Sequence, residues 1–193
     1  MYVEEQARLQ VAAGYDAMAE IVASLIEAVD EDDELDATTD EVTAAVRSAW
    51  QERLAEQESW PAETDVDRLL RAFAALDRDG VLARDHFTCC QRCGHDEIGG
   101  AVPAGQRRDG YTFFHQQDTE RAASGGPLYL AYGAFGGPDL ASNHPAGDDP
   151  AGDEAIGRRV VKALEAERLS VEWDGTSASR IAVHLAWHRR LPA

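Results

Sequence analysis

Apolar residues recur every three or four positions through the first 80 residues, which is the spacing of one face of an α-helix. The first stripe predicts a helix over about 3–29. The second predicts a helix with Asp40 as its N-cap, and the third a helix that starts at Thr64 and ends at Gly80. The stripes consist of Val11, Tyr15, Met18, Val22, Leu25 and Val29; Val42, Val46, Ala49, Trp50 and Leu54; and Val66, Leu69, Leu70, Phe73 and Leu76. We therefore expect about three helices in the N-terminal part.

After residue 80 the pattern changes to short runs of β-branched and aromatic residues bounded by glycine, which is typical of strands. Strands are predicted over 81–88, 111–116 and 128–132, followed by a loop over 136–152 and a helix capped by Asp153. Two further strands then flank a turn at Asp174-Gly175. The return strand alternates Ile181, Val183, Leu185 and Trp187 with polar residues. The predicted fold class is α+β, with the N-terminal helices followed by a mainly antiparallel five-stranded sheet and one or two packed helices.

The chain of 193 residues has the length of one domain with an appendage. Its charge is uneven, because residues 1–80 carry 21 acidic and 6 basic side chains, whereas residues 81–193 carry 15 acidic and 12 basic ones. We therefore distinguish an acidic helical segment over 1–60 from an α+β domain over 61–193. We expect the two to form one cooperative unit.

The overall charge excludes some partners. With a net charge of −18, the surface repels phosphate backbones and anionic lipids, so we expect neither a nucleic acid nor a membrane partner. A basic protein is the partner that the acidic segment favours. No apolar run reaches the length of a spanning helix, and the N-terminus lacks the order of a signal peptide, so the expected location is the cytoplasm.

Residues 87–97 contain all three cysteines and are the densest group of reactive side chains. Cys90, Cys93 and Gly94 have the spacing of a zinc knuckle, in which glycine permits the tight turn around the ion. A structural zinc ion needs four ligands, and a second Cys-x-x-Cys pair is absent from the sequence. The predicted metal ligands are Cys90, Cys93, His95 and His115, with Asp118 and Cys89 as further candidates.

The two halves of this site follow different predicted strands. Cys89 and Cys90 come after the strand over 81–88, and His115 ends the strand over 111–116. Both groups therefore leave the C-terminal ends of their strands. They meet if the strands run parallel, whereas simple antiparallel neighbours would separate them.

Other interpretations of these residues stay open. Free cysteines in a cytosolic protein are most often buried as small apolar side chains, and the ring of His115 can instead hydrogen-bond to Asp118. A thiol enzyme is a further alternative, with Cys90 as nucleophile, His115 as base and Asp118 orienting the base. Cys90 and Cys93 would be the redox pair.

Several sequence motifs are shared with a known family. They include Phe87-Thr88-Cys89-Cys90 with Cys93-Gly94, Phe114-His115-Gln116-Gln117-Asp118-Thr119-Glu120, Leu128-Tyr129-Leu130-Ala131-Tyr132-Gly133 and Val171-Glu172-Trp173-Asp174-Gly175. On these motifs the chain resembles an actinobacterial family classed as a domain of unknown function. The resemblance implies that the motifs belong to one cooperative unit, and it assigns no activity, metal or partner.

Together these observations predict a cytoplasmic, non-catalytic binding or regulatory module. Its cysteine and histidine segment would be structural and bind zinc. The rival hypothesis is the thiol-dependent enzyme that uses Cys90 and His115.

Overall fold

The computed structural model describes residues 2–32, 35–136, 145 and 149–192. The chain divides into two compact units. The first consists of residues 1–64 with 188–193, and the second of residues 65–187. That the two units unfold together, as one cooperative unit, stays a prediction.

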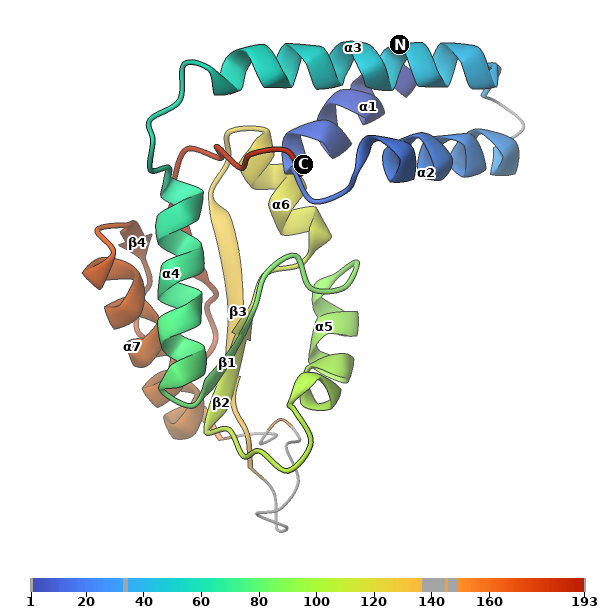
Figure 1. Cartoon of the computed structure of the whole chain (residues 1–193). Coiled ribbons are helices and arrows are strands. Elements are labelled where there is room, and N and C mark those ends of the chain that lie inside the picture. Colours follow the sequence, from blue (N-terminus) through green and yellow to red (C-terminus); the bar gives the residue numbers. More distant parts are fainter. Residues whose placement is uncertain (1, 33–34, 137–144, 146–148, 193) are drawn as a thin grey trace. The chain divides into compact units, whose positions relative to one another are not determined.

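The first unit contains three helices, α1 (Tyr2–Ala13), α2 (Met18–Glu31) and α3 (Thr39–Gln57) (Figure 1). The prediction of one helix over about 3–29 was wrong, because Gly14 adopts a φ of +75°, a left-handed conformation that ends the first helix. The chain restarts as α2, where the backbone N–H of Ala17 donates to the Glu20 carboxylate at 2.8 Å. The buried core of this unit comprises Ala7, Val11, Ile21, Leu25, Val42, Val46, Ala49 and Trp50.

Helix α3 begins at a different cap from the predicted Asp40. The hydroxyl of Thr38 accepts the backbone N–H of Glu41 at 3.3 Å, and the Glu41 carboxylate accepts the backbone N–H of Thr38 at 2.8 Å. This reciprocal capping box satisfies two N–H groups at the start of the helix. Asp40 instead lies within the first turn.

The last residues of the chain belong to the first unit. The ring of His188 stacks on Trp60 with 4.7 Å between the centroids. Arg189 donates from Nε to the carbonyl of Gly14 at 3.0 Å, and its guanidinium carbon lies 3.7 Å from the centre of the Tyr15 ring. The C-terminal segment thus stabilises the turn between α1 and α2.

The second unit begins with α4 (Asp65–Arg78), the fourth helix before the first strand rather than the third, because Gly14 divides the first predicted helix. Its other elements are β1 (Val81–Arg84), α5 (Gln91–Glu97), the short 3-10 helix η1 (Ile98–Ala101), β2 (Gly110–Phe113), α6 (Gln116–Ala123), β3 (Leu128–Ala134), α7 (Pro150–Ala166), β4 (Ser170–Glu172) and β5 (Ile181–His184). The strands form one sheet in the order β1-β2-β3-β5-β4.

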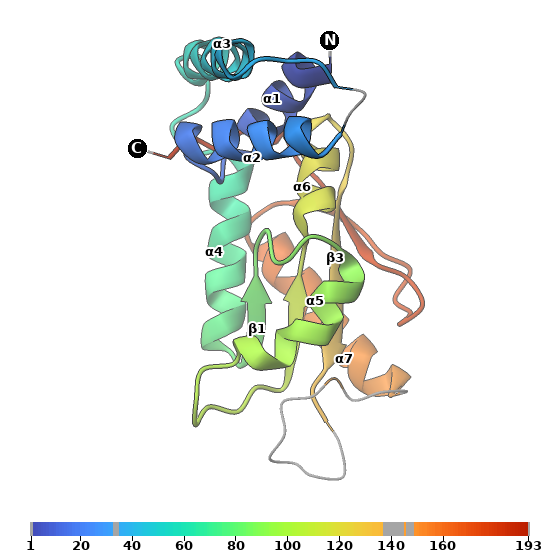
Figure 2. The same ribbon diagram turned by 90° about the vertical axis from the view of Figure 1, so that its right-hand side faces the viewer.

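The predicted α+β class with a five-stranded sheet is confirmed, but the sheet is mixed. Strands β1 and β2 run parallel, with Val81 opposite Gly110, while β3 runs antiparallel to β2 and β5. Strand β4 is antiparallel to β5. The parallel pair arises because the chain between β1 and β2 contains α5 and η1, which return it to the same end of the sheet (Figure 2).

Several predicted boundaries shift. Strand β1 ends at Arg84, and the cysteines lie at the start of helix α5, which the sequence did not predict. Helix α6 replaces the end of the strand predicted over 111–116. The start of α6 is explained by its N-cap, His115, because the His115 side chain accepts the backbone N–H of Asp118.

The C-terminal elements also begin and end elsewhere than predicted. Helix α7 has Asp149 as its N-cap instead of Asp153, and the side chain of Asp149 accepts the backbone N–H of Gly152 at 3.1 Å. Of the loop predicted over 136–152, residues 137–144 and 146–148 lie outside the described residues. Strand β5 ends at His184, and beyond it the buried ring of Trp187 packs edge-on against Phe114.

Helices cover both faces of the sheet (Figures 1 and 2). Helices α4 and α7 contact each other and pack on one face. On the other face, α5 and η1 lie over an apolar cluster consisting of Leu82, Ile98, Tyr111, Phe113 and Ala131. Among the described residues, none of the helices is long and apolar enough to cross a membrane.

Candidate metal site

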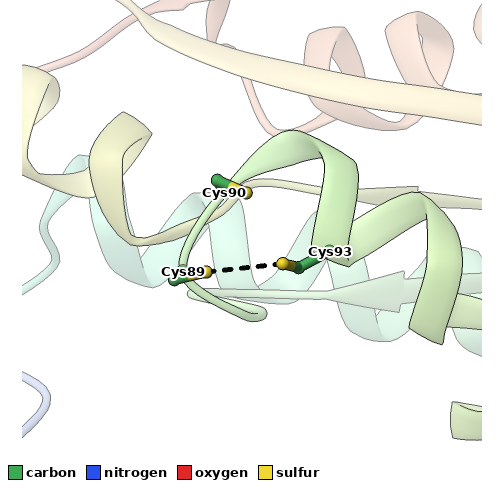
Figure 3. A group of neighbouring side chains, drawn as sticks. All are labelled: Cys89, Cys90 and Cys93. Atoms are coloured by element: carbon green, nitrogen blue, oxygen red, sulfur yellow. Dashed lines mark hydrogen bonds between the residues drawn. The ribbon is translucent and has the colours of Figure 1, made fainter.

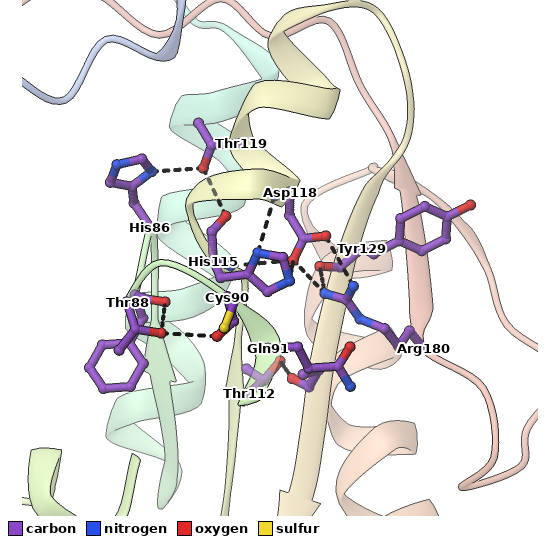
Figure 4. Close-up of polar contacts among 12 residues, drawn as sticks. His86, Thr88, Cys90, Gln91, Thr112, His115, Asp118, Thr119, Tyr129 and Arg180 are labelled. Carbon is purple, nitrogen blue, oxygen red and sulfur yellow. Dashed lines mark hydrogen bonds and ion pairs between the residues drawn. The ribbon is translucent and has the colours of Figure 1, made fainter. Parts of the chain in front are cut away.

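The parallel pairing of β1 and β2 brings their C-terminal ends together. Beyond the strands, the backbone N–H of Phe87 donates to the carbonyl of Phe114 at 2.8 Å, and that of Gln116 donates to the carbonyl of Thr88 at 3.1 Å. The segment that carries the cysteines therefore lies beside the segment that carries His115 and Asp118 (Figure 4). Both segments therefore lie at the same end of the sheet, as follows from parallel strands.

The three cysteines form a compact cluster, shown in Figure 3. The Sγ atoms of Cys89, Cys90 and Cys93 all lie within 4.8 Å of one another, and those of Cys89 and Cys93 are 3.6 Å apart. Cys90 is the N-cap of α5 and Cys93 belongs to its first turn, so the start of the helix sets their spacing. Cys89 is exposed, and the other two are half-buried. Such a group could hold a metal ion.

Hydrogen bonds within the cluster shift the pKa values of Cys90 and Cys93 in opposite directions. The backbone N–H of Cys93, and then its thiol, donate to the sulfur of Cys90 and hold the pKa of Cys90 below its usual range. Hydrogen bonds of the Cys93 thiol, first with Cys89 and then with Cys90, raise the pKa of Cys93 to about 12. The thiol of Cys90 therefore loses its proton more readily than the thiol of Cys93, whose proton a metal ion would have to displace.

The loop before the cluster is held by its own polar contacts. Thr88 has a φ of +57°, which is unusual for a β-branched residue. Its hydroxyl donates to the carbonyl of Phe87 at 2.6 Å and lies 3.2 Å from the carbonyl oxygen of Cys90. These contacts turn the chain so that Cys89 and Cys90 face the first turn of α5.

Gly94 has a role different from the tight turn that a zinc knuckle implies. It lies inside α5 and is buried. A Cβ atom at this position would approach Cε2 of Phe113 to 2.3 Å, far inside contact distance. The glycine therefore lets α5 pack closely on β2, and it supports the cysteines by positioning the helix.

His95 lies on the side of α5 that faces β2. Its Nδ1 is 3.0 Å from the hydroxyl of Tyr111, and its ring packs edge-on against Tyr111 and Phe113. Burial, and secondarily the positive charge of Arg180, lower the pKa of His95. In the part of the chain that the structure describes, the close group of possible metal ligands consists of the three cysteines without His95.

His115 and Asp118 form a buried pair at the start of α6. The backbone N–H of Asp118 donates to Nδ1 of His115 at 3.3 Å, and Nε2 of His115 lies 2.9 Å from Oδ2 of Asp118. Because Nδ1 accepts, Nε2 carries the proton of a neutral ring. Burial lowers the pKa of His115, an effect that Asp118 opposes and Arg180 reinforces. Both ring nitrogens are thus engaged with Asp118, as the structural interpretation of this histidine anticipated.

Arg180 completes this group and was missed by the sequence reasoning. Its guanidinium binds both carboxylate oxygens of Asp118, with Nη1 3.0 Å from Oδ1, and donates to the carbonyl of Tyr129 at 2.6 Å. Asp118 is 2% exposed, so the arginine neutralises a carboxylate that water cannot reach. No local motif signals this contact, because the two residues are 62 positions apart.

The first unit has a separate groove of about 510 Å³. Helices α1 and α3 and the chain before α3 line it, with several alanines among its apolar residues. The ionisable side chains along it are Glu4, Arg8, Asp36, Glu41 and Glu52. The groove therefore combines a small apolar surface with an excess of carboxylates.

Comparison with known proteins places the whole chain in one family. Residues 1–191 match the model of "Domain of unknown function (DUF6891)", which covers both compact units and the C-terminal segment. No curated protein and no solved structure matches the sequence. The chain belongs to the DUF6891 family.

Proposed function

We propose that this protein is a non-catalytic, metal-binding module in which Cys89, Cys90 and Cys93 hold a zinc ion. The proposal is carried by the mutual approach of the three Sγ atoms to within 4.8 Å. In tetrahedral zinc sites with Zn–S bonds of about 2.3 Å, neighbouring sulfurs lie about 3.8 Å apart. The 3.6 Å separation of Cys89 and Cys93 fits this value, so binding needs only a small approach of the third sulfur.

The donor set supports zinc in particular. Thiolates favour thiophilic ions over magnesium or calcium, which prefer oxygen. Three protein sulfurs leave the fourth zinc ligand to a water molecule or to a group from outside the cluster. In this proposal Cys89 takes a place that the sequence assigned to a histidine, because His95 and His115 are committed to Tyr111 and Asp118.

The thiol-enzyme alternative receives less support from the geometry. A Cys-His pair needs an imidazole nitrogen free to accept the thiol proton. Nδ1 of His115 accepts from the backbone of Asp118, and Nε2 faces its carboxylate. Asp118 in turn is bound by Arg180, so these three residues are better suited to stabilising the end of the sheet.

The metal proposal is tested by elemental analysis of the full chain, purified without a polyhistidine tag. We expect about one zinc ion per chain, and a loss of most of it in the variants Cys89→Ser, Cys90→Ser and Cys93→Ser. His115→Asn and the surface control His184→Ala should retain it. A metal-free wild type that takes up no zinc on titration would refute the proposal, and loss of zinc in His115→Asn would restore that residue as a ligand.

A second element of the proposed function is a basic protein partner for the first unit. Residues 1–64 and 188–193 carry 17 acidic and 5 basic side chains, and the groove between α1 and α3 gathers four of the carboxylates beside an apolar floor. A peptide with alternating arginine and leucine complements both features. Titration calorimetry should detect this peptide and not its glutamate-leucine counterpart. Binding that survives in Asp36→Asn combined with Glu52→Gln would place the peptide elsewhere.

A further inference from the structure

The exposed Cys89 and the half-buried Cys93 have the geometry of an attacking and a resolving thiol. Their sulfurs are 3.6 Å apart, close to van der Waals contact, and the structure describes both as free thiols. We propose that the metal-free cluster reduces small disulfides, with Cys89 attacking the substrate and Cys93 closing an intramolecular disulfide. This activity uses cysteines of the proposed metal site but does not require the ion.

The reaction balances without a further reactant. The sulfur of Cys89 attacks one sulfur of a disulfide RSSR, which forms a mixed disulfide and releases the first thiol RSH. Cys93 then gives up its thiol proton, and its sulfur attacks the sulfur of Cys89 and releases the second RSH. Two thiols of the protein are oxidised to one disulfide, the substrate accepts two electrons, and the two thiol protons leave with the products.

The roles of the cysteines follow from accessibility and distance. Cys89 is the exposed member of the three, so a substrate can approach its sulfur. Closing the bond shortens the distance between the sulfurs of Cys89 and Cys93 from 3.6 Å to about 2.05 Å. Figure 3 shows Cys90 apart from the line that joins these two sulfurs. Cys90 forms no covalent bond in this reaction, although its sulfur accepts hydrogen bonds from Cys93.

Metal binding and this reduction exclude each other, because each uses the same sulfur electron pairs. A zinc ion on the three thiolates would shield Cys89 and slow its attack on a disulfide. Oxidation of Cys89 and Cys93 would leave Cys90 as the one thiolate of the cluster, too few ligands to retain the ion. The protein's capacity for zinc should thus fall as the disulfide forms.

The test uses the full-length, reduced and chelator-treated chain with hydroxyethyl disulfide as the probe. Mass spectrometry with peptide mapping should find that wild type loses two hydrogen atoms, carries no adduct and links Cys89 to Cys93. Cys93→Ser should instead retain about one hydroxyethylthio adduct, at Cys89, because the resolving thiol is absent. Cys89→Ser should react at least about tenfold more slowly, and Cys90→Ser should still form the disulfide.

Other outcomes would overturn the proposal. These are adducts that persist on wild type without an intramolecular bond, a Cys90–Cys93 product, or a Cys90→Ser variant that cannot form the disulfide. Far-UV circular dichroism of each variant verifies that it is folded. Zinc titration of the same reduced sample separates the two functions. A chain that forms the disulfide but binds no zinc would support the disulfide reduction and refute the metal proposal.

Discussion

Arg180 and Asp118 form a bidentate ion pair that joins the residue before β5 to the first turn of α6. Nη1 lies 3.0 Å from Oδ1, and Nη2 contacts Oδ2. The same guanidinium packs over the ring of Tyr129, 5.6 Å from its centre. The pair therefore fixes the buried carboxylate that also holds His115 in place.

Replacing Arg180 should destabilise the protein strongly. Arg180→Met leaves the Asp118 carboxylate buried without its main counter-charge, and we expect a loss of about 3 kcal/mol in the free energy of unfolding. Urea denaturation at neutral pH measures it. The exposed Arg158, 3.6 Å from the half-buried Glu154, provides the control, and Arg158→Ala should change stability by less than about 0.5 kcal/mol. Equal losses of unfolding free energy in both variants would show that burial does not increase the contribution of the ion pair to stability.

Acid should destabilise the protein through His115. Burial lowers its pKa in the folded state below the usual value of about 6.5, so the unfolded chain binds more protons as the pH falls through that region. Stability should therefore decrease between about pH 7 and pH 5. His115→Asn keeps a side-chain acceptor at the N-cap but does not titrate there. If the denaturation midpoints of wild type and variant fall in parallel with pH, His115 is not responsible.

Adding one methyl group at Gly94 should disturb the site from a distance. In Gly94→Ala the new Cβ would overlap the Phe113 ring, so α5 must move away from β2. We expect a loss of about 2 kcal/mol in stability and a lower zinc content. Gly100→Ala is the matched control, because a Cβ there meets nothing within 4 Å. Normal stability and zinc binding in Gly94→Ala would contradict the role assigned to this packing.

Low ionic strength should destabilise the first unit, which carries 17 acidic against 5 basic residues. Its carboxylates repel one another, and salt screens that repulsion. Thermal unfolding in a sodium chloride series should show a midpoint that rises with salt. A single transition throughout would support the expected cooperative unit. A midpoint that stays constant would mean that the acidic side chains are already compensated, and would weaken the case for a basic partner.

The sequence by itself determined the elements whose signal is local. The apolar stripes predicted α3 and α4, and the β-branched runs predicted the starts of β1 and β3. Hydrophobic periodicity arises from burial of one face, so it survives in any packing arrangement. The periodicity does not reveal the end of a helix at Gly14, because the apolar stripe resumes in α2 after the turn.

The tertiary structure decided which side chains lie together in and around the cysteine cluster. The clustering of the cysteines in sequence made a metal or thiol site predictable, but the choice of Cys89 over a histidine depends on the first turn of α5 and on the contacts of His95 with Tyr111. The parallel pairing of β1 with β2 depends on where the connecting chain returns. The partnership of Asp118 with Arg180 likewise depends on long-range packing, because only the folded sheet brings together charges that the sequence keeps 62 positions apart.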